Sequence, residues 1–186
     1  MLKNRLNRLP ALLLGAQIAL IITGGAVRLT KSGLGCPTWP ECAKGSYLPS
    51  EHQSEPLINI WIEFANRMLT FVLAALAIVT FGWVLKTGRK NLRLLAFLQI
   101  LGIFGQAVLG GITVLTDLHP LPVAGHFILS IILIAGAQSL LTKAKIPYVR
   151  IELSKNTLHF LSRGHVVLTF IVIVVGTLVT GSGPHA

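Results

Sequence analysis

Five long stretches without Asp, Glu, Lys or Arg constrain this chain more than any other feature. They are 18 to 25 residues long and cover residues 9–27, 68–85, 94–116, 118–142 and 164–186. A helix of roughly 20 apolar residues spans the hydrocarbon core of a bilayer, and backbone hydrogen bonds must be satisfied within such a segment. The stretches are too long and too evenly apolar for the strands of a membrane barrel. The sequence therefore predicts an all-α integral membrane protein with five transmembrane helices.

The distribution of charge predicts how these helices cross the membrane. Only 12% of the residues are charged, although the formal net charge is +10. The N-terminal arm and the segments at 86–93 and 143–163 carry 12 basic residues and one acidic residue, whereas the opposite side carries four basic and five acidic residues. By the positive-inside rule, the N-terminus is cytoplasmic and the C-terminus is outside. The basic character thus indicates membrane topology in a multi-pass protein of a prokaryotic plasma membrane, and not a nucleic-acid partner.

The predicted helices fall into a four-helix bundle and one further helix. We expect helices at about 9–29, 61–85, 94–116, 120–142 and 163–182. Ala107 and Gly111 lie four residues apart, with Gly105 and Gly110 nearby, and this spacing of small residues favours close helix packing. The helix exit at 30–33 is echoed at 180–184, on the same predicted side of the membrane. We therefore expect a four-helix bundle over residues 1–142 with an extracytoplasmic loop at 30–60, a cytoplasmic linker at 143–162, and the first helix of an incomplete second bundle at 163–186.

Ionisable residues inside membrane helices are costly, so each is a candidate functional residue. Glu63, Asn66 and Arg67 share one helical face by their spacing, and Glu63 and Arg67 can form an ion pair. The structural alternative is an interfacial salt bridge beside a membrane-anchoring Trp61. Because Arg28 ends the preceding helix on the same side of the membrane, the sequence gathers several polar groups at one depth.

His126 is the candidate metal ligand. Imidazole in a dry helix bundle is a natural axial ligand for haem iron, and Arg28 and Arg67 would match haem propionates because guanidinium binds carboxylates bidentately. The alternative is a histidine that is simply hydrogen-bonded inside the protein.

Cys36 and Cys42 are the two cysteines of the chain. Five residues separate them, two of which are prolines, so the loop can turn back and bring the sulfurs together. They fall in the predicted outer loop, where disulfides persist. The pair is either a structural staple or a redox-active dithiol, and the second role would require an accessible thiolate of low pKa.

Several separate blocks of this sequence resemble the haem A synthase family. The first is GGAVRLTKSGLGCPTWPEC at 24–42, which is similar to the first-helix exit and outer loop of that family. The similarity continues through the segment from Glu63 to Arg67, through GQAVLGGITVLTDLHP at 105–120 and His126, and ends with GTLVTGSGPHA at 176–186.

The resemblance implies a membrane oxidoreductase that converts the C8 methyl group of haem O to the formyl group of haem A for cytochrome oxidase. It implies two pseudo-repeated four-helix bundles, of which the first receives haem O and the second holds haem b. On this mapping Glu63 is the catalytic carboxylate, Arg28, Arg67 and Asn66 contact the haem, His126 ligates its iron, and Cys36 and Cys42 form the loop disulfide. The implied partners are haem O, membrane lipid, a protoheme farnesyltransferase, and a complementary half or a second copy of the chain.

Two departures from the family pattern limit this mapping. The family often has E-x-x-H-R in its second helix, where this chain has Asn66 in place of the histidine. Asparagine is a poor iron ligand, so His126 alone, or His126 with another group, would hold the iron. The last three helices of the family and their histidine pair have no counterpart in this sequence. The alternatives to an active enzyme are a non-catalytic haem-binding or assembly half-bundle and a quinone-linked thiol oxidoreductase that uses the cysteine pair.

Overall fold

The computed structural model describes residues 8–49, 55–145 and 156–181 and contains five long helices in that part of the chain. These helices are α2 (Leu9–Leu29), α3 (Leu57–Lys86), α4 (Lys90–Leu115), α5 (Pro120–Ala144) and α6 (Asn156–Gly181). Each helix is long and apolar enough to cross a membrane. The predicted fold class, five membrane-spanning helices, is therefore confirmed.

Three of the helices begin earlier than the sequence predicts. Helix α3 begins at Leu57, directly after Pro56, α4 begins at Lys90, and α6 begins at Asn156. The predicted starts at 94 and 163 lie next to Arg93 and at Arg163, but a charged side chain does not end a helix. The predicted helix at 61–85 already includes Glu63 and Arg67, and these two side chains pair with each other in α3.

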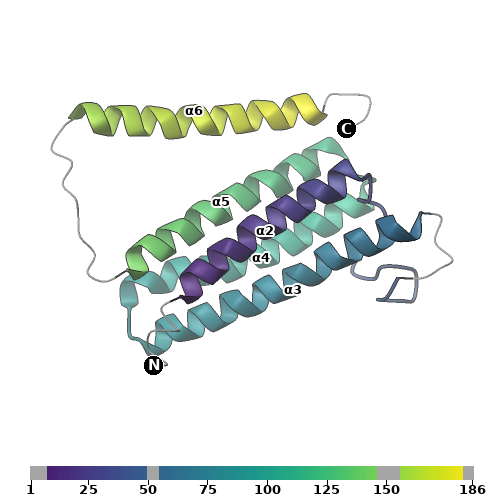
Figure 1. Cartoon of the computed structure of the whole chain (residues 1–186), viewed down its shortest axis with the longest axis horizontal. Helices are drawn as coiled ribbons and strands as arrows, with labels where there is room; N and C mark the ends of the chain where they lie inside the picture. The colour runs from purple at the N-terminus through teal and green to yellow at the C-terminus, as the bar shows by residue number, and fades with distance from the viewer. Residues whose placement is uncertain (1–7, 50–54, 146–155, 182–186) are drawn as a thin grey trace.

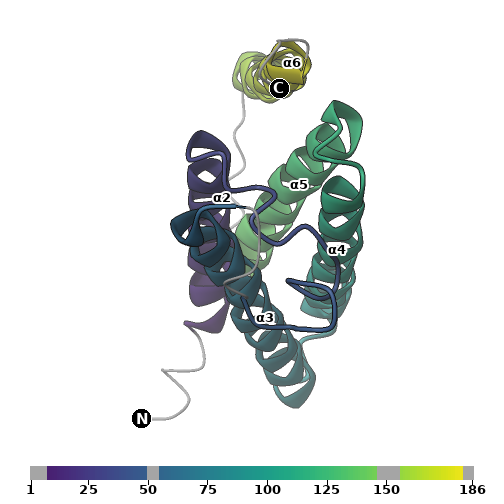
Figure 2. The same ribbon diagram turned by 90° about the vertical axis from the view of Figure 1, so that its right-hand side faces the viewer.

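Helices α2 to α5 form a closed ring in which each helix packs against two others (Figures 1 and 2). Consecutive helices run in opposite directions, and α2 closes the ring by packing against α5. Apolar side chains fill the interior of this bundle, including Leu13, Leu73, Ala77, Val84, Leu92, Ala96, Ile103, Ala137 and Leu140. The ring thus has two ends, and the loop of residues 30–49 covers one of them, which we call the loop end.

Glycines allow α4 and α5 to approach closely, as the spacing of small residues predicts. A Cβ atom at Gly105 would lie 3.4 Å from Leu129, and one at Gly136 would lie 2.6 Å from the side-chain nitrogen of Gln99. The expectation is wrong for Gly111, however. This glycine faces the ring of Trp39 in the loop, and not a neighbouring helix.

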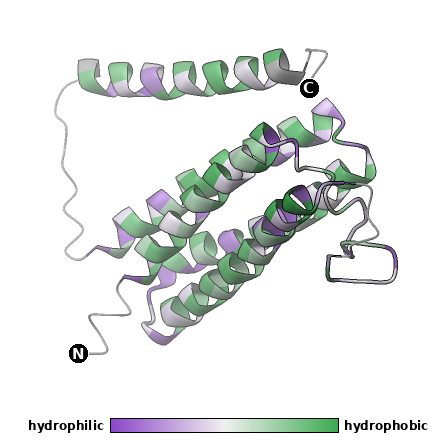
Figure 3. Cartoon of the chain, turned by 45° about the vertical axis from the view of Figure 1, so that its right-hand side comes forward, coloured by the Kyte–Doolittle hydropathy of each residue, from purple (hydrophilic) through white to green (hydrophobic). Residues whose placement is uncertain are grey.

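Helix α6 lies beside α5 and outside the ring (Figure 1). Hydrophobic residues occur along the whole length of α6 (Figure 3). Its apolar side chains, among them Phe160, Val166 and Val172, are mostly exposed to the surroundings. An exposed apolar helix of this length is compatible with a lipid environment. The candidate site residues all come from the other four helices and from the loop.

Candidate functional site

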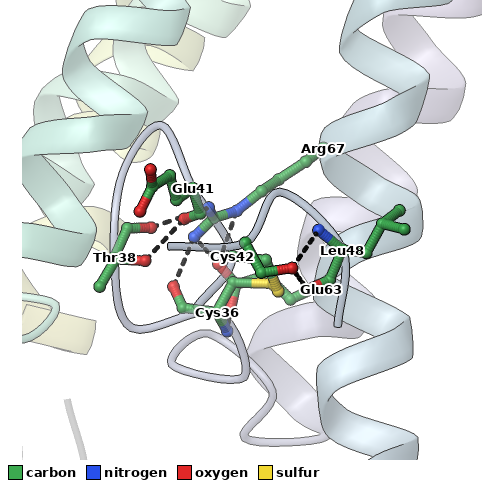
Figure 4. Close-up of a disulfide and its surroundings, with 8 residues drawn as sticks. Cys36, Thr38, Glu41, Cys42, Leu48, Glu63 and Arg67 are labelled. Carbon is green, nitrogen blue, oxygen red and sulfur yellow. Dashed lines mark hydrogen bonds and ion pairs between the residues drawn. A yellow bond between two sulfur atoms is a disulfide. The ribbon is translucent and has the colours of Figure 1, made fainter. Parts of the chain in front are cut away.

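The loop of residues 30–49 is held closed by a disulfide between Cys36 and Cys42 (Figure 4). Both cysteines are buried, at 0% and 2% exposure, and pack against Ile60 and Phe64 at the start of α3. The predicted disulfide is therefore present. Thiol exchange requires an accessible sulfur, so the burial favours the structural staple over the redox-active pair.

The backbone of the loop rests directly on the first turns of α3. A Cβ atom at Gly35 would lie 2.7 Å from the carbonyl oxygen of Asn59 and 2.8 Å from Cα of Ile60. No larger residue fits between the two backbones without moving them. Gly35 therefore allows the loop and the helix to approach closely just before the first cysteine.

Arg67 joins the loop to α3 through its whole guanidinium group. Its Nε and Nη2 atoms donate to Oε1 of Glu63, the Nε bond being 3.0 Å long. Nη1 donates to the carbonyls of Thr38 and Glu41, at 2.9 and 3.2 Å, and Nη2 donates to the carbonyl of Cys36 at 2.6 Å (Figure 4). Arginine has five N–H donors, and all five are used within the protein. For Arg67 to bind a propionate, some of these bonds would have to break.

Glu63 completes this connection from the other side. The predicted ion pair with Arg67 is present, and the second carboxylate oxygen accepts a 2.8 Å hydrogen bond from the backbone N–H of Cys36. Glu63 is 5% exposed, so its charge is balanced almost entirely by these groups. We call Glu63 and Arg67 the loop latch, because between them they bind both the N–H and the carbonyl of Cys36.

Asn66 lies between the latch residues in sequence but contacts a different element. Its side-chain oxygen accepts a 2.7 Å hydrogen bond from the hydroxyl of Thr23 on α2. Arg28 lies in the last turn of α2 and is exposed at the loop end. The structure thus brings Glu63 and Arg67 together, and it places Asn66 and Arg28 at the same end without adding them to the latch.

His126 lies near the start of α5, with its ring against α4. A Cβ atom at Gly110 would lie 3.4 Å from Cε1 of the ring. The Nδ1 atom is buried and has no hydrogen-bond partner among the described residues, although the ring interacts with the backbone of Gln106. The described residues contain no cluster of three or more His, Cys, Asp and Glu side chains that could hold a metal ion.

Trp39 is a contact residue that the sequence analysis did not identify. Its ring lies so close to α4 that a Cβ atom at Gly111 would fall 2.6 Å from Cδ2 of the indole. The loop therefore starts at α2, is latched to α3 and reaches α4. Gly110 and Gly111 are neighbours, so the ring of His126 and the ring of Trp39 meet α4 at adjacent residues.

We expect Gly111→Ala to displace Trp39 from α4. Alanine favours a helix over glycine by roughly 0.5–1 kcal/mol, so any loss of loop docking must come from the new methyl group. In a Trp61→Phe, Trp83→Phe background, iodide should quench the fluorescence of Trp39 more strongly in the variant. Gly125→Ala is the matched control, because no atom lies within 4 Å of its added Cβ. Equal quenching in both variants would contradict the contact.

The chain matches known proteins over most of its length. Residues 8–184 match the family model described as "Cytochrome oxidase assembly protein". A protein named "Heme A synthase" from Lysinibacillus sphaericus is 38% identical over 121 residues, which is 63% of this chain and 38% of the relative. Proteins of the same name from Exiguobacterium sibiricum and Shewanella oneidensis are each 29% identical, over 73% and 72% of this chain and 45% and 42% of the relatives.

This chain spans about two-fifths of the length of these curated relatives. No solved structure matches it significantly.

Proposed function

The chain belongs to the haem A synthase family of cytochrome oxidase assembly proteins, and we propose that helices α2 to α5 bind haem O for oxidation of its C8 methyl to a formyl group. The protein is a multi-pass membrane protein. We further propose that it lies in the plasma membrane with its N-terminus in the cytoplasm and its loop end outside. The excess of basic residues at the opposite end supports this orientation.

The observation that carries the proposal is the environment of His126. A buried imidazole whose Nδ1 lacks a partner of ordinary geometry costs free energy unless it serves a ligand or a further contact. Imidazole suits haem iron, and the other candidate residues lie at the same end of the bundle. His126 would hold the iron, and Arg28 would pair with a propionate. Arg67 could take that second role only if the loop latch opened.

Glu63 would act at the reacting edge of haem O. The haem iron and its oxidant supply the chemistry that converts the methyl group to a formyl group. The protein supplies position and charge. Glu63 would balance positive charge that develops beside the methyl group or accept the protons that leave it. Its carboxylate is already held by Arg67 and by the N–H of Cys36, so its position is fixed before substrate binds.

We expect Glu63→Gln to retain haem O and to lose oxidation. The amide keeps the shape but lacks the charge, and a positioned acid or base typically contributes 10²- to 10⁴-fold to a rate. The measurement is the haem O to haem A ratio, by chromatography of extracted haems, in membranes that make haem O and express this chain. Glu41→Gln is the control, because the Glu41 carboxylate lies in the loop at the same end of the bundle but accepts a hydrogen bond from the backbone N–H of Gly45. An unchanged haem A yield in Glu63→Gln would refute the role.

A haem-binding unit without oxidation activity is the second candidate. This candidate is favoured by the bonding of Glu63. Both oxygens of its carboxylate are bonded within the latch, as expected for a residue with a purely structural role. The same experiment separates the two candidates. Wild-type chain that carries haem O but yields no haem A would favour the binding unit, whereas haem A formation requires the enzyme.

A further inference from the structure

The packed core of the four-helix ring does not extend to the loop end. Each helix has a segment below the loop in which no residue is buried, and all four segments belong to the part of the chain that the structure describes. These segments are 18–29, 64–72, 104–110 and 120–132. Burial resumes only where the loop rests on the helices, at Glu63 and Gly111. The ring therefore surrounds a section in which its helices bury no side chain, although four helices enclose it (Figure 2).

The helical repeat shows which residues face inward in this section. Residues seven apart lie on the same face of a helix, two turns from each other. The buried residues that border the section on the side of the packed core are Gln17, Leu73, Ile103 and Leu133. Seven residues closer to the loop end, in the same order of helices, are Gly24, Asn66, Gly110 and His126. We call these four residues the inward layer, and two of them are glycines.

The two glycines of the inward layer have different surroundings. A Cβ atom at Gly110 would lie 3.4 Å from the ring of His126, so the absence of a side chain there makes room for the imidazole. A Cβ atom at Gly24 would meet no atom within 4 Å. Glycines that serve close helix packing have a neighbour in contact, and Gly24 has none. Protein interiors are normally close-packed, so the inward face of α2 at Gly24 borders open space.

We propose that Gly24 is a specificity-determining residue, which keeps this space open for the edge of the haem ring. The identity of the ligand rests on the proposed function, whereas the open space does not. A flat macrocycle extends from its iron toward several helices at once, so a haem held by His126 must also find room at the neighbouring positions of the inward layer. Helix α2 packs directly against α5, which places Gly24 on a helix beside His126. Any side chain at position 24 would project into the space that the ring needs.

The first test measures thermal unfolding of the haem-free chain in detergent. Alanine is more favourable than glycine within a helix, and open space accepts its methyl group, so we expect Gly24→Ala to raise the unfolding midpoint. Gly82→Ala is the matched control, because Gly82 also has no atom within 4 Å of an added Cβ but lies near the other end of α3. Gly102→Ala should lower the midpoint, because its new methyl group would collide with the side chain of Leu133. A lowered midpoint in Gly24→Ala would show that the space is filled and would overturn the proposal.

The second test titrates the same chain with ferric protoporphyrin IX and follows the Soret absorption of the bound haem. We expect Gly24→Leu to lose haem binding, because leucine would fill the space, and Gly82→Leu to bind as the wild type does. Circular dichroism checks that both variants fold. Binding by Gly24→Leu equal to that of the wild type would overturn the proposal. If Gly24→Ala is stabilised but the wild-type chain binds no haem, the proposed function and the identity of this ligand fail, and the open space beside Gly24 is upheld.

Discussion

Replacement of Arg67 by alanine is expected to release the loop from the bundle and to lower the free energy of unfolding by about 3–5 kcal/mol. Removal of one partner of a buried ion pair has an effect of this size, because the other charge remains buried without compensation. Here that charge is Glu63, which is 5% exposed. The loop also loses every bond from the guanidinium to its carbonyls, at Thr38, Glu41 and Cys36.

Two measurements follow the consequences of Arg67→Ala separately. Thermal or denaturant unfolding in detergent reports the change in stability. The rate at which a water-soluble reductant opens the Cys36–Cys42 disulfide reports the release of the loop, because both sulfurs are buried while the latch is closed.

The matched controls for Arg67→Ala distinguish geometry from charge. Arg67→Lys keeps the charge but offers a single ammonium group where the planar fork of arginine bonds several acceptors, so we expect it to recover only part of the stability. Arg163→Ala removes an exposed arginine from α6 and should change neither measurement. Wild-type reduction kinetics in Arg67→Ala would show that the latch does not hold the loop.

Replacement of His126 by alanine is expected to abolish the low-spin haem absorption of the purified chain. The imidazole is the proposed axial ligand, so we expect a larger loss than the about 10- to 100-fold that residues behind a ligand contribute. The helix contact should survive, because Gln106 bonds the backbone carbonyl of His126 and not its ring. Loss of haem would therefore not result from loss of the fold.

The measurement for His126→Ala is the visible spectrum and the pyridine haemochrome of chain purified from membranes that make haem O. His159→Ala is the control, because His159 lies exposed on α6, away from the loop end. Circular dichroism should be the same for both variants. An unaltered haem spectrum in His126→Ala would refute ligation by this residue.

The five helices could be predicted from the sequence because the bilayer demands long apolar segments, and an uncharged stretch is visible without any knowledge of packing. The starts of α4 and α6 were less predictable. Arg93 and Arg163 look like the ends of apolar spans, but both lie within helices.

The site was predictable only where partners are close in sequence or carry a distinctive side chain. The Glu63–Arg67 pair follows from its spacing of four residues, and the two cysteines suggest their own pairing. The other partners of Arg67 are backbone carbonyls, which every residue has, so no side chain signals them. Trp39 and Gly111 come from distant segments of the chain, so no sequence pattern predicts their contact. Gln106 is a neutral residue inside an apolar stretch, so no sequence pattern predicts its contact with α5.

The latch also orders the assembly of this end of the protein during synthesis. Cys36, Cys42, Glu63 and Arg67 all precede α4 in the chain, so the disulfide and the latch can form once α3 has emerged from the ribosome. The contact of Trp39 must wait for Gly111, and His126 follows later still. The loop would thus be fastened to α3 before the helices that complete the loop end are made, and a chain that stalls after α3 would still carry a closed loop.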